Sequence, residues 1–224
     1  MTRIRQTSNS RGSLKFIQLL INKNQSYINR LIKQSFSEIR DDEIYWLSPL
    51  EDDEYAEYRD DSFLNIIGFD PKEIELTKFW PRRGPQWDAL AKTKTGKVIL
   101  VEAKANKREI ASSATKAKGK SKQLIIESLL EIKEFMQIKN DVDWSGKYYQ
   151  YTNRLFHLFY LRIKCNKPVF LVNIYFTEEN TVVSTTLEQF HEAIDSLNKW
   201  LGVKNDNLSD YIANIFIDVN DLKI

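Results

Sequence analysis

The stretch that decides the fold is Pro85-Gln-Trp-Asp-Ala-Leu-Ala-Lys-Thr-Lys-Thr-Gly-Lys-Val-Ile-Leu-Val-Glu-Ala-Lys104. Its two apolar-rich runs, residues 87–91 and 97–104, predict a pair of strands. Between them, Lys94-Thr95-Gly96 predicts a three-residue hairpin loop, with glycine in the left-handed conformation that such a turn requires. If Thr93 pairs with Lys97, the numbers of paired residues add up to 93 + 97 = 190.

This register brings three charged side chains to one face of the hairpin. Asp88 lies opposite Glu102, because 88 + 102 is also 190, and the period of two places Lys104 on the same face as Glu102. Two facing carboxylates repel each other, so the arrangement needs a cation. Lys104 supplies part of that charge and a divalent metal ion would supply more. The plainer alternative is an ordinary hairpin in which Lys104 forms salt bridges with both acids.

An Asp on one strand and Glu-x-Lys at the end of the next resemble the active-site signature of the PD-(D/E)XK nuclease superfamily, which has the restriction-endonuclease-like fold. The matching residues are Asp88, Glu102, Ala103 and Lys104, whereas the proline stands at Pro85 instead of directly before the aspartate. The signature is short and degenerate, and the resemblance spans residues 49–176. Some uncharacterised bacterial nuclease-like proteins also look similar in having a Tyr-Gln-x-x-Asn-Arg-Leu segment after the Glu-x-Lys strand.

The resemblance implies a site for Mg²⁺ or Mn²⁺ and hydrolysis of phosphodiester bonds in nucleic acid, with DNA favoured. Asp88, Glu102 and the main-chain carbonyl of Ala103 would hold the metal ion, which prefers oxygen ligands. Lys104 would orient or activate the attacking water and steady the negative charge. A role in bacterial defence or repair follows from the resemblance alone.

The other elements are expected from periodicity and capping signals. Residues 13–35, 49–67, 122–138 and 147–164 predict helices, as do the residues from Thr185 to Gly202; residues 73–80, 168–176 and 212–219 predict strands. The order of helix, three strands, helices and buried strand matches the αβββαβ core of the resembled superfamily. We therefore expect an α/β fold with a mixed central sheet flanked by helices, and extra helices at both ends.

Glu57 is the candidate for a third acid in the site. The capping signals Ser48, Pro49 and Glu51 place it on the helix over 49–67, within the apolar sector that faces the core. Members of the superfamily often add an acid from the first core helix, so Glu57 could lean into the metal site. It could equally lie at the margin of the helix, paired with an arginine or a lysine.

Composition narrows the class of protein. The 224 residues, 42% of them hydrophobic and 29% charged, suit a single domain over 1–224 with a real core. No run of 18 apolar residues is present, so no membrane partner is expected. The single cysteine, Cys165, with only two histidines, argues against a Cys/His zinc site. Together with a polar start at residues 1–10, it predicts a cytoplasmic location.

Charge is unevenly distributed along the chain. Residues 38–61 hold 11 acidic against 2 basic residues, a net of −9, whereas residues 104–122 hold 7 basic residues against 1 acidic, a net of +6. A charge run is often only a solvated loop, but this basic segment leaves the candidate catalytic strand directly, where a phosphate backbone would lie. The candidate nucleic-acid contacts in it are Lys107, Arg108, Ser112, Ser113, Lys116, Lys118 and Lys120. The two serines could also be plain loop residues.

A further group of candidate contacts is Gln150, Asn153 and Arg154, at i, i+3 and i+4 on one stripe of the helix over 147–164. An exposed amide and guanidinium could contact phosphate or a base edge, or they could bond to each other on the helix surface. His157, among apolar neighbours, is expected to be packed and hydrogen-bonded and not to act as a base.

Two alternatives to a nuclease stay open. One is a nucleic-acid-binding or scaffolding module that keeps the fold and the basic segment without cleaving. The other is a metal-free protein-interaction domain that uses the acidic residues 38–61. Partner proteins or a homodimer are compatible with each of these readings.

Overall fold

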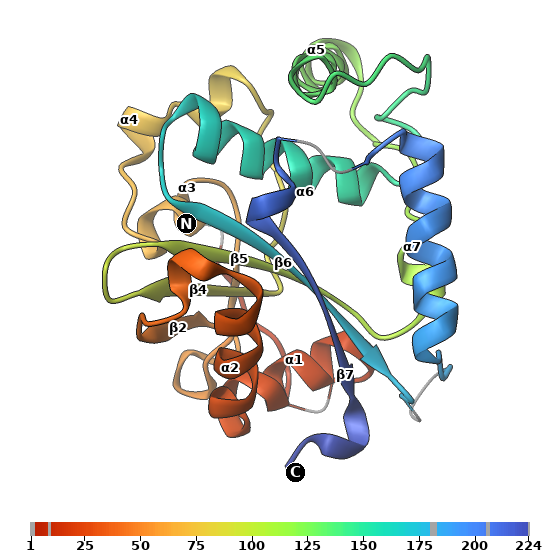
Figure 1. Cartoon of the computed structure of the whole chain (residues 1–224). Coiled ribbons are helices and arrows are strands. Elements are labelled where there is room, and N and C mark those ends of the chain that lie inside the picture. The colour runs from red at the N-terminus through yellow and green to blue at the C-terminus, as the bar shows by residue number, and fades with distance from the viewer. Residues whose placement is uncertain (1–2, 9, 180–182, 205–206, 224) are drawn as a thin grey trace.

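A mixed five-stranded sheet forms the centre of the computed structural model, which describes residues 3–8, 10–179, 183–204 and 207–223 (Figure 1). The strand order is β2-β4-β5-β6-β7. β4 runs antiparallel to its two neighbours β2 and β5, and β5, β6 and β7 are parallel. The strands are β2 (Ile44–Ser48), β4 (Ala89–Thr93), β5 (Val98–Lys104), β6 (Val169–Thr177) and β7 (Ile212–Asp218).

The hairpin register is confirmed. Ala89 pairs with Val101 and Leu90 with Leu100, so paired numbers add up to 190. The N–H of Thr93 donates to the carbonyl of Lys97 at 2.7 Å, which closes the loop. Gly96 has a φ of +92°, the left-handed conformation expected of it.

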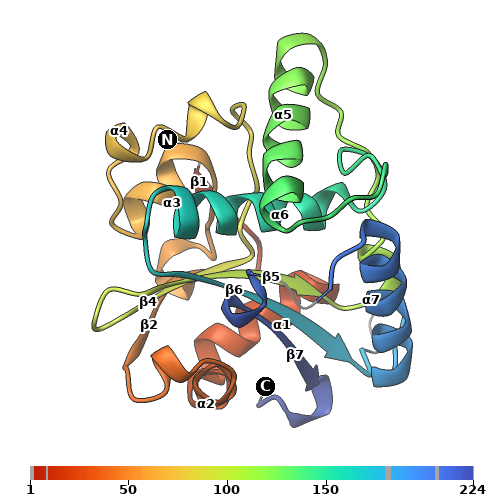
Figure 2. The ribbon, with the colours of Figure 1, turned by 45° about the horizontal axis from the view of Figure 1, so that its top comes forward.

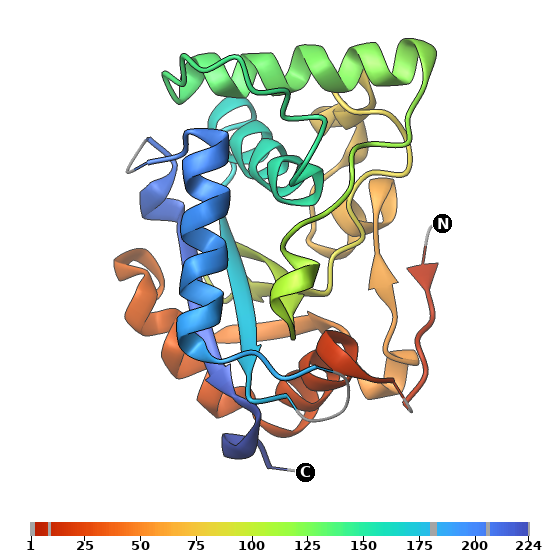
Figure 3. The same ribbon diagram turned by 90° about the vertical axis from the view of Figure 1, so that its right-hand side faces the viewer.

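Helices cover both faces of the sheet (Figures 1 and 2). α1 (Gly12–Lys23) and α2 (Gln25–Ser35) pack on one face. On the other lie α3 (Asp60–Ile66), α4 (Pro71–Ile74), α6 (Tyr149–Phe159) and α7 (Leu187–Leu201). α5 (Gly119–Phe135) crosses α6 on the side away from the sheet (Figure 3).

Side chains alternate between the two faces along each strand, as the period of two requires. In the hairpin, Leu90 and Leu100 pack toward α6, whereas Ala91 and Ile99 pack toward α1 and α2. All nine residues of β6 are buried, which confirms the expectation of a strand covered on both faces.

The helix expected over 49–67 and the strand expected over 73–80 are wrong. Residues 51–53 form a short 3-10 turn, β3 (Glu57–Tyr58) pairs with β1 (Arg3–Ile4), and only α3 is helical in the first range. In the second range Asp70 caps α4 by accepting from the N–H of Lys72. That Asp-Pro start favours a helix more strongly than the short apolar run favours a strand.

The strand that pairs with β4 is instead β2, which precedes the proposed boundary of the core at residue 49. The helix expected over 13–35 is divided at Asn24, whose side chain bonds to both the N–H and the carbonyl of Lys223. α5, α6, α7, β6 and β7 follow their expected positions within a few residues, α7 being capped by Thr186 and not Thr185. None of the described helices is long and apolar enough to cross a membrane.

Candidate functional site

The β4–β5 hairpin brings Asp88 and Glu102 to the α6 face of the sheet. Asp88 directly precedes β4, and its Oδ2 accepts a hydrogen bond of 2.7 Å from the main-chain N–H of Ala103. Glu102 lies in β5 and is 6% exposed. One carboxylate is therefore bonded to the backbone next to the other, so the two acids face the same side.

Two cations hold Glu102. Lys104 Nζ donates to its Oε1, and Arg154 Nε, reaching down from α6, donates to its Oε2 at 2.7 Å. Burial would raise the pKa of Glu102, but the charges of Arg154 and Lys104 outweigh burial and lower that pKa. Glu102 is therefore ionised and fixed in position.

Glu57 joins this pair from β3, and not from a helix as expected. Its Oε2 accepts from Gln6 Nε2 at 3.0 Å and from Gln86 Nε2, and its side chain is buried. Burial raises the pKa of Glu57, and the charge of Glu102 raises it further. The partners of Glu57 are thus two neutral amides, and the expected alternative of an arginine or lysine partner is wrong.

The cluster of Glu57, Asp88, Glu102, Lys104 and Arg154 has three carboxylates and two cations, a net of −1 when all are ionised. The excess falls on Asp88, because burial raises its pKa well above the ordinary value and the charge of Glu102 adds to the effect. Asp88 therefore favours either a proton or an added cation.

Mg²⁺ fits this donor set in its chemistry. It takes oxygen ligands, commonly one or two carboxylates, and completes its shell with waters and substrate phosphate. Among the described residues no group of three or more His, Cys, Asp or Glu side chains surrounds one point closely enough to hold a metal ion. The residues that would hold it are accordingly Asp88 and Glu102, with Glu57 as a neighbour.

A small hollow of about 20 Å³ opens beside Glu102, enough space for about one water molecule. The described residues that line it are Glu102, Lys104, Ile110, Gln150, Tyr151, Arg154, Asn173, Tyr175 and Leu197. Asn173 of β6 lies opposite Glu102 of β5, and its Nδ2 donates to Asn214 of β7 at 3.0 Å. Asn173 is not among the residues that the sequence patterns single out, although it is a polar residue in the middle of an apolar strand.

The basic segment, residues 104–122, departs from a plain loop. It holds a 3-10 turn at Lys107–Glu109, and the N–H of Thr115 donates to the carbonyl of Ser145. Most of its candidate contacts are exposed: Lys107, Arg108, Ser113, Lys116, Lys118 and Lys120. Ser112 instead accepts from the N–H of Gln150 at 2.8 Å, so it caps α6.

The stripe on α6 also differs from the expectation of an exposed surface. Arg154 is 4% exposed and Asn153 is buried, whereas Gln150 is partly exposed at the hollow. Arg154 thus contacts Glu102 and not solvent. His157 is confirmed as a packed residue: its Nδ1 is 2.8 Å from the carbonyl of Asn153, and burial lowers its pKa to about 3.

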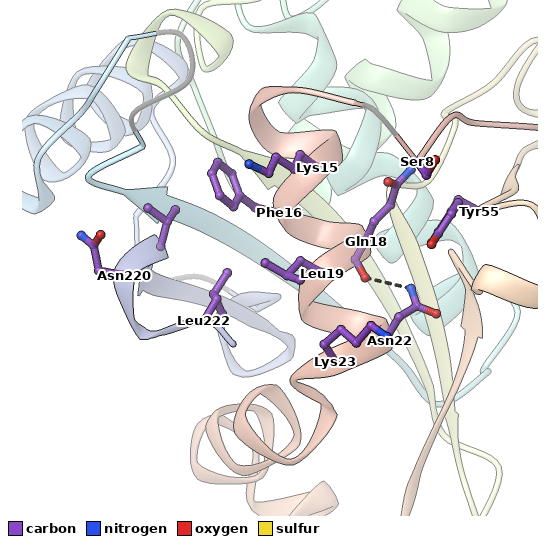
Figure 4. A pocket seen from close by; sticks show the side chains of 11 residues that line it. Ser8, Lys15, Phe16, Gln18, Leu19, Asn22, Lys23, Tyr55, Asn220 and Leu222 are labelled. Atoms are coloured by element: carbon purple, nitrogen blue, oxygen red, sulfur yellow. Dashed lines mark hydrogen bonds between the residues drawn. The ribbon is translucent and has the colours of Figure 1, made fainter. Parts of the chain in front are cut away.

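A second hollow, of about 330 Å³, lies against α1 on the opposite face of the sheet (Figure 4). The side-chain amides of Gln18 and Asn22 are already paired within the protein. Gln18 Oε1 accepts from Ser10, and Asn22 donates to the carbonyls of Gln18 and Pro49. Lys15 and Lys23 also line this hollow and no acidic side chain is among its described lining residues, so its charge is positive, whereas the cluster on the α6 face has a net negative charge.

Comparison of the chain with protein-family models gives no match, and comparisons with curated proteins and with solved structures give none either.

Proposed function

We propose that the protein is a divalent-metal-dependent nuclease that hydrolyses phosphodiester bonds in nucleic acid, with DNA as the preferred substrate. The observation that carries this proposal is the placement of Asp88, Glu102 and Lys104 on one face of the hairpin, with Glu57 beside them. The resemblance to PD-(D/E)XK nucleases rests on the same residues.

In this proposal Asp88 and Glu102 hold Mg²⁺ or Mn²⁺, and the resemblance adds the main-chain carbonyl of Ala103. When bound, the ion supplies Lewis-acid stabilisation of the phosphate and activates a water for attack. The net charge of −1 in the cluster supports an added cation, because a cation relieves the repulsion that Asp88 experiences.

In this proposal, Lys104 orients or activates the attacking water. Its side chain is 13% exposed and lines the hollow, so its ammonium group can donate to a water and to a phosphate oxygen. In the protein alone, Nζ donates to Glu102. A positive charge at this point also stabilises the negative charge that develops on the phosphate during hydrolysis.

The basic segment would carry the phosphate backbone. It starts at the end of β5, so Lys107 and Arg108 follow the site directly, and Lys116, Lys118 and Lys120 extend the exposed charge toward α5. Such exposed lysines and arginines contribute a sequence-independent, salt-sensitive affinity for nucleic acid.

The order of elements also supports the proposal. Helices α1 and α2 precede three antiparallel strands, β2, β4 and β5, and helices α5 and α6 precede the parallel strand β6. This order agrees with the αβββαβ core that the resemblance implies only when β3, α3 and α4, which stand between β2 and β4, are set aside; it also begins near residue 12 and not at residue 49.

The test is cleavage of linear, circular and single-stranded DNA in millimolar Mg²⁺, comparing wild type with Lys104→Ala and Lys94→Ala. Lys94 is a matched control because it lies at the other end of the same hairpin, 69% exposed. We expect Lys104→Ala to lose cleavage while it retains folding and DNA binding, and Lys94→Ala to cut like wild type. Equal cutting by wild type and Lys104→Ala would end the proposal.

The second candidate is a nucleic-acid-binding module without cleavage, which the exposed basic segment favours by itself. Binding that weakens steeply with salt, without cutting of any substrate in Mg²⁺ or Mn²⁺, would favour this reading. The protein-interaction reading is weakened, because acids in 38–61 are bonded internally: Asp42 to Thr95, Asp53 to Arg3, and Asp60 to the N–H of Gly84.

A further inference from the structure

Arg154 contacts β5, which carries Glu102, and the segment before β4, which carries Asp88. Its Nε donates to Glu102 Oε2 at 2.7 Å, and its NH2 group donates to the main-chain carbonyl of Gln86 at 2.9 Å. The guanidinium carbon also lies 5.0 Å from the centre of the Trp87 ring. One side chain of α6 therefore fixes Glu102 on β5 and the two residues before Asp88.

Gln86 continues this chain of contacts to the third acid. Its side-chain amide donates to Glu57, while its carbonyl accepts from Arg154. Hydrogen bonds thus connect Glu102, Arg154, Gln86 and Glu57 in one chain, and Asp88 lies two residues after Gln86. Asp88 itself is held by the N–H of Ala103, next to Glu102.

We propose that Arg154 is a positioning residue that, with Gln86, sets the spacing of the acids for a divalent cation. This inference rests on the proposed function and deepens it, because it assigns Arg154 a task at the same site and removes it from the contacts to nucleic acid. Arg154 is 4% exposed, and its guanidinium is bonded to Glu102 and Gln86 and lies against Trp87, so the task assigned to it is to act through Glu102 and not directly on the substrate.

The chemistry of arginine explains why this residue stands here. A guanidinium is planar and has five N–H donors in a fixed fork, so it can bond to a carboxylate and a carbonyl at once. A lysine ammonium in the same place keeps the charge, but it cannot hold both acceptors in a defined geometry. The substitution Arg154→Lys therefore keeps the positive charge but removes the two-point contact, so it tests positioning separately from charge.

The experiment measures Mn²⁺ binding by titration calorimetry, without substrate, at a temperature where circular dichroism shows each variant folded. The variants are Arg154→Lys, Gln86→Ala and the control Arg162→Lys. Arg162 is matched to Arg154: it bonds to a carboxylate, Glu38, and lies over an aromatic ring, Tyr211 at 3.7 Å, but away from the site.

We expect Arg154→Lys to weaken Mn²⁺ binding by about tenfold or more, the usual effect of losing a residue that orients metal ligands. Gln86→Ala should weaken it less, because the Arg154–Glu102 contact stays. Arg162→Lys should lower only the melting temperature and leave the affinity for Mn²⁺ unchanged. In cleavage assays Arg154→Lys should reduce kcat more than it raises KM for DNA, and excess Mn²⁺ should restore part of the rate.

Unchanged Mn²⁺ affinity in Arg154→Lys and Gln86→Ala, beside a wild type that binds and cuts, would overturn this inference and leave the proposed function standing. Should Arg154→Lys not fold, unchanged affinity in Gln86→Ala alone would overturn it. A wild type that binds no Mn²⁺ would remove the metal site, and the proposed function and this inference with it.

Discussion

Two aspartates contact opposite ends of the β4–β5 hairpin, and they differ in the groups that stabilise their negative charge. Asp42, which is buried, lies before β2, and Asp88, which is half-buried, lies directly before β4. At the loop end, Asp42 accepts from the hydroxyl and the N–H of Thr95 and from Lys97 Nζ at 3.4 Å. At the other end, Asp88 accepts from one N–H, that of Ala103, and faces Glu102.

The pKa values of the two aspartates move in opposite directions. Burial would raise the pKa of Asp42, but the hydrogen bonds from Thr95, Thr93 and Lys97 outweigh burial and lower it to about 2. Burial and the charge of Glu102 raise the pKa of Asp88 well above its ordinary value. The first aspartate stabilises the fold, whereas the second is held at a cost to stability, which is typical of functional sites.

The largest predicted difference between the two aspartates concerns the metal-induced rise in melting temperature and the rate of cleavage. Asp88→Asn should abolish the rise in melting temperature caused by millimolar Mg²⁺ or Mn²⁺ and slow cleavage by at least about 100-fold, because a metal-holding carboxylate is lost. The same change should leave the metal-free protein as stable as wild type or slightly more stable, since a repelled charge is removed. Thermal melts with and without the metal measure both effects.

Asp42→Asn should do the reverse. We expect it to lower the free energy of unfolding by about 1–2 kcal/mol, because hydrogen bonds to a charged acceptor are weakened. The rise in melting temperature on adding metal should stay as in wild type. Denaturant titration gives the first quantity, and a lost metal response in Asp42→Asn would show that the two ends of the hairpin are not independent.

Asp42 and Asp88 should change the stability of the folded protein in opposite directions as the pH falls. The contribution of Asp42 is present above its unfolded pKa of about 3.9 and is lost as pH falls toward its folded pKa of about 2. Asp88 acts oppositely, because its raised pKa makes the folded state bind more protons, so stability rises as pH falls from that raised pKa toward about 4. Denaturant titrations from pH 8 to pH 2 should show a maximum on the acid side of neutrality, and Asp88→Asn should remove the rise.

The smallest predicted effect per substituted residue is the loss of DNA affinity when lysines of the basic segment are replaced. Replacing Lys116, Lys118 and Lys120 with Gln should weaken binding to DNA by about two- to threefold per charge and flatten its dependence on salt. Replacing Lys15, Lys23 and Lys33 of α1 and α2 removes the same number of charges from the opposite face. Equal losses in both triple variants, measured by fluorescence anisotropy, would show that net charge matters and the position of the segment does not.

The parts of the site that sequence reasoning could find are close together along the chain. Asp88, Glu102 and Lys104 lie within one hairpin, whose register follows from a glycine loop and strand alternation. The stripe on α6 predicts an exposed Arg154, whereas the residue is buried, because its partner Glu102 is 52 positions away along the chain. β2 was missed because its short strand Ile44–Ser48 stands between acidic stretches, and its partner β4 lies far along the chain.

For Glu57, too, the sequence does not reveal the long-range contacts that place the residue. Its proximity to the site was among the expectations, but its element was wrong: the pairing of β1 with β3, and the amides of Gln6 and Gln86, place it there. Contacts across 29 and 51 positions leave no periodic signal in the sequence.

The sequence by itself determined the hairpin, its register and the shared face of Asp88, Glu102 and Lys104. It could do so because strand alternation and a tight turn are local properties of the backbone. The tertiary structure alone decided that Arg154 is buried against Glu102 and that Glu57 arrives on a strand. Those placements depend on how α6 and the β1–β3 pair pack against the sheet, and packing brings together residues that the chain keeps far apart.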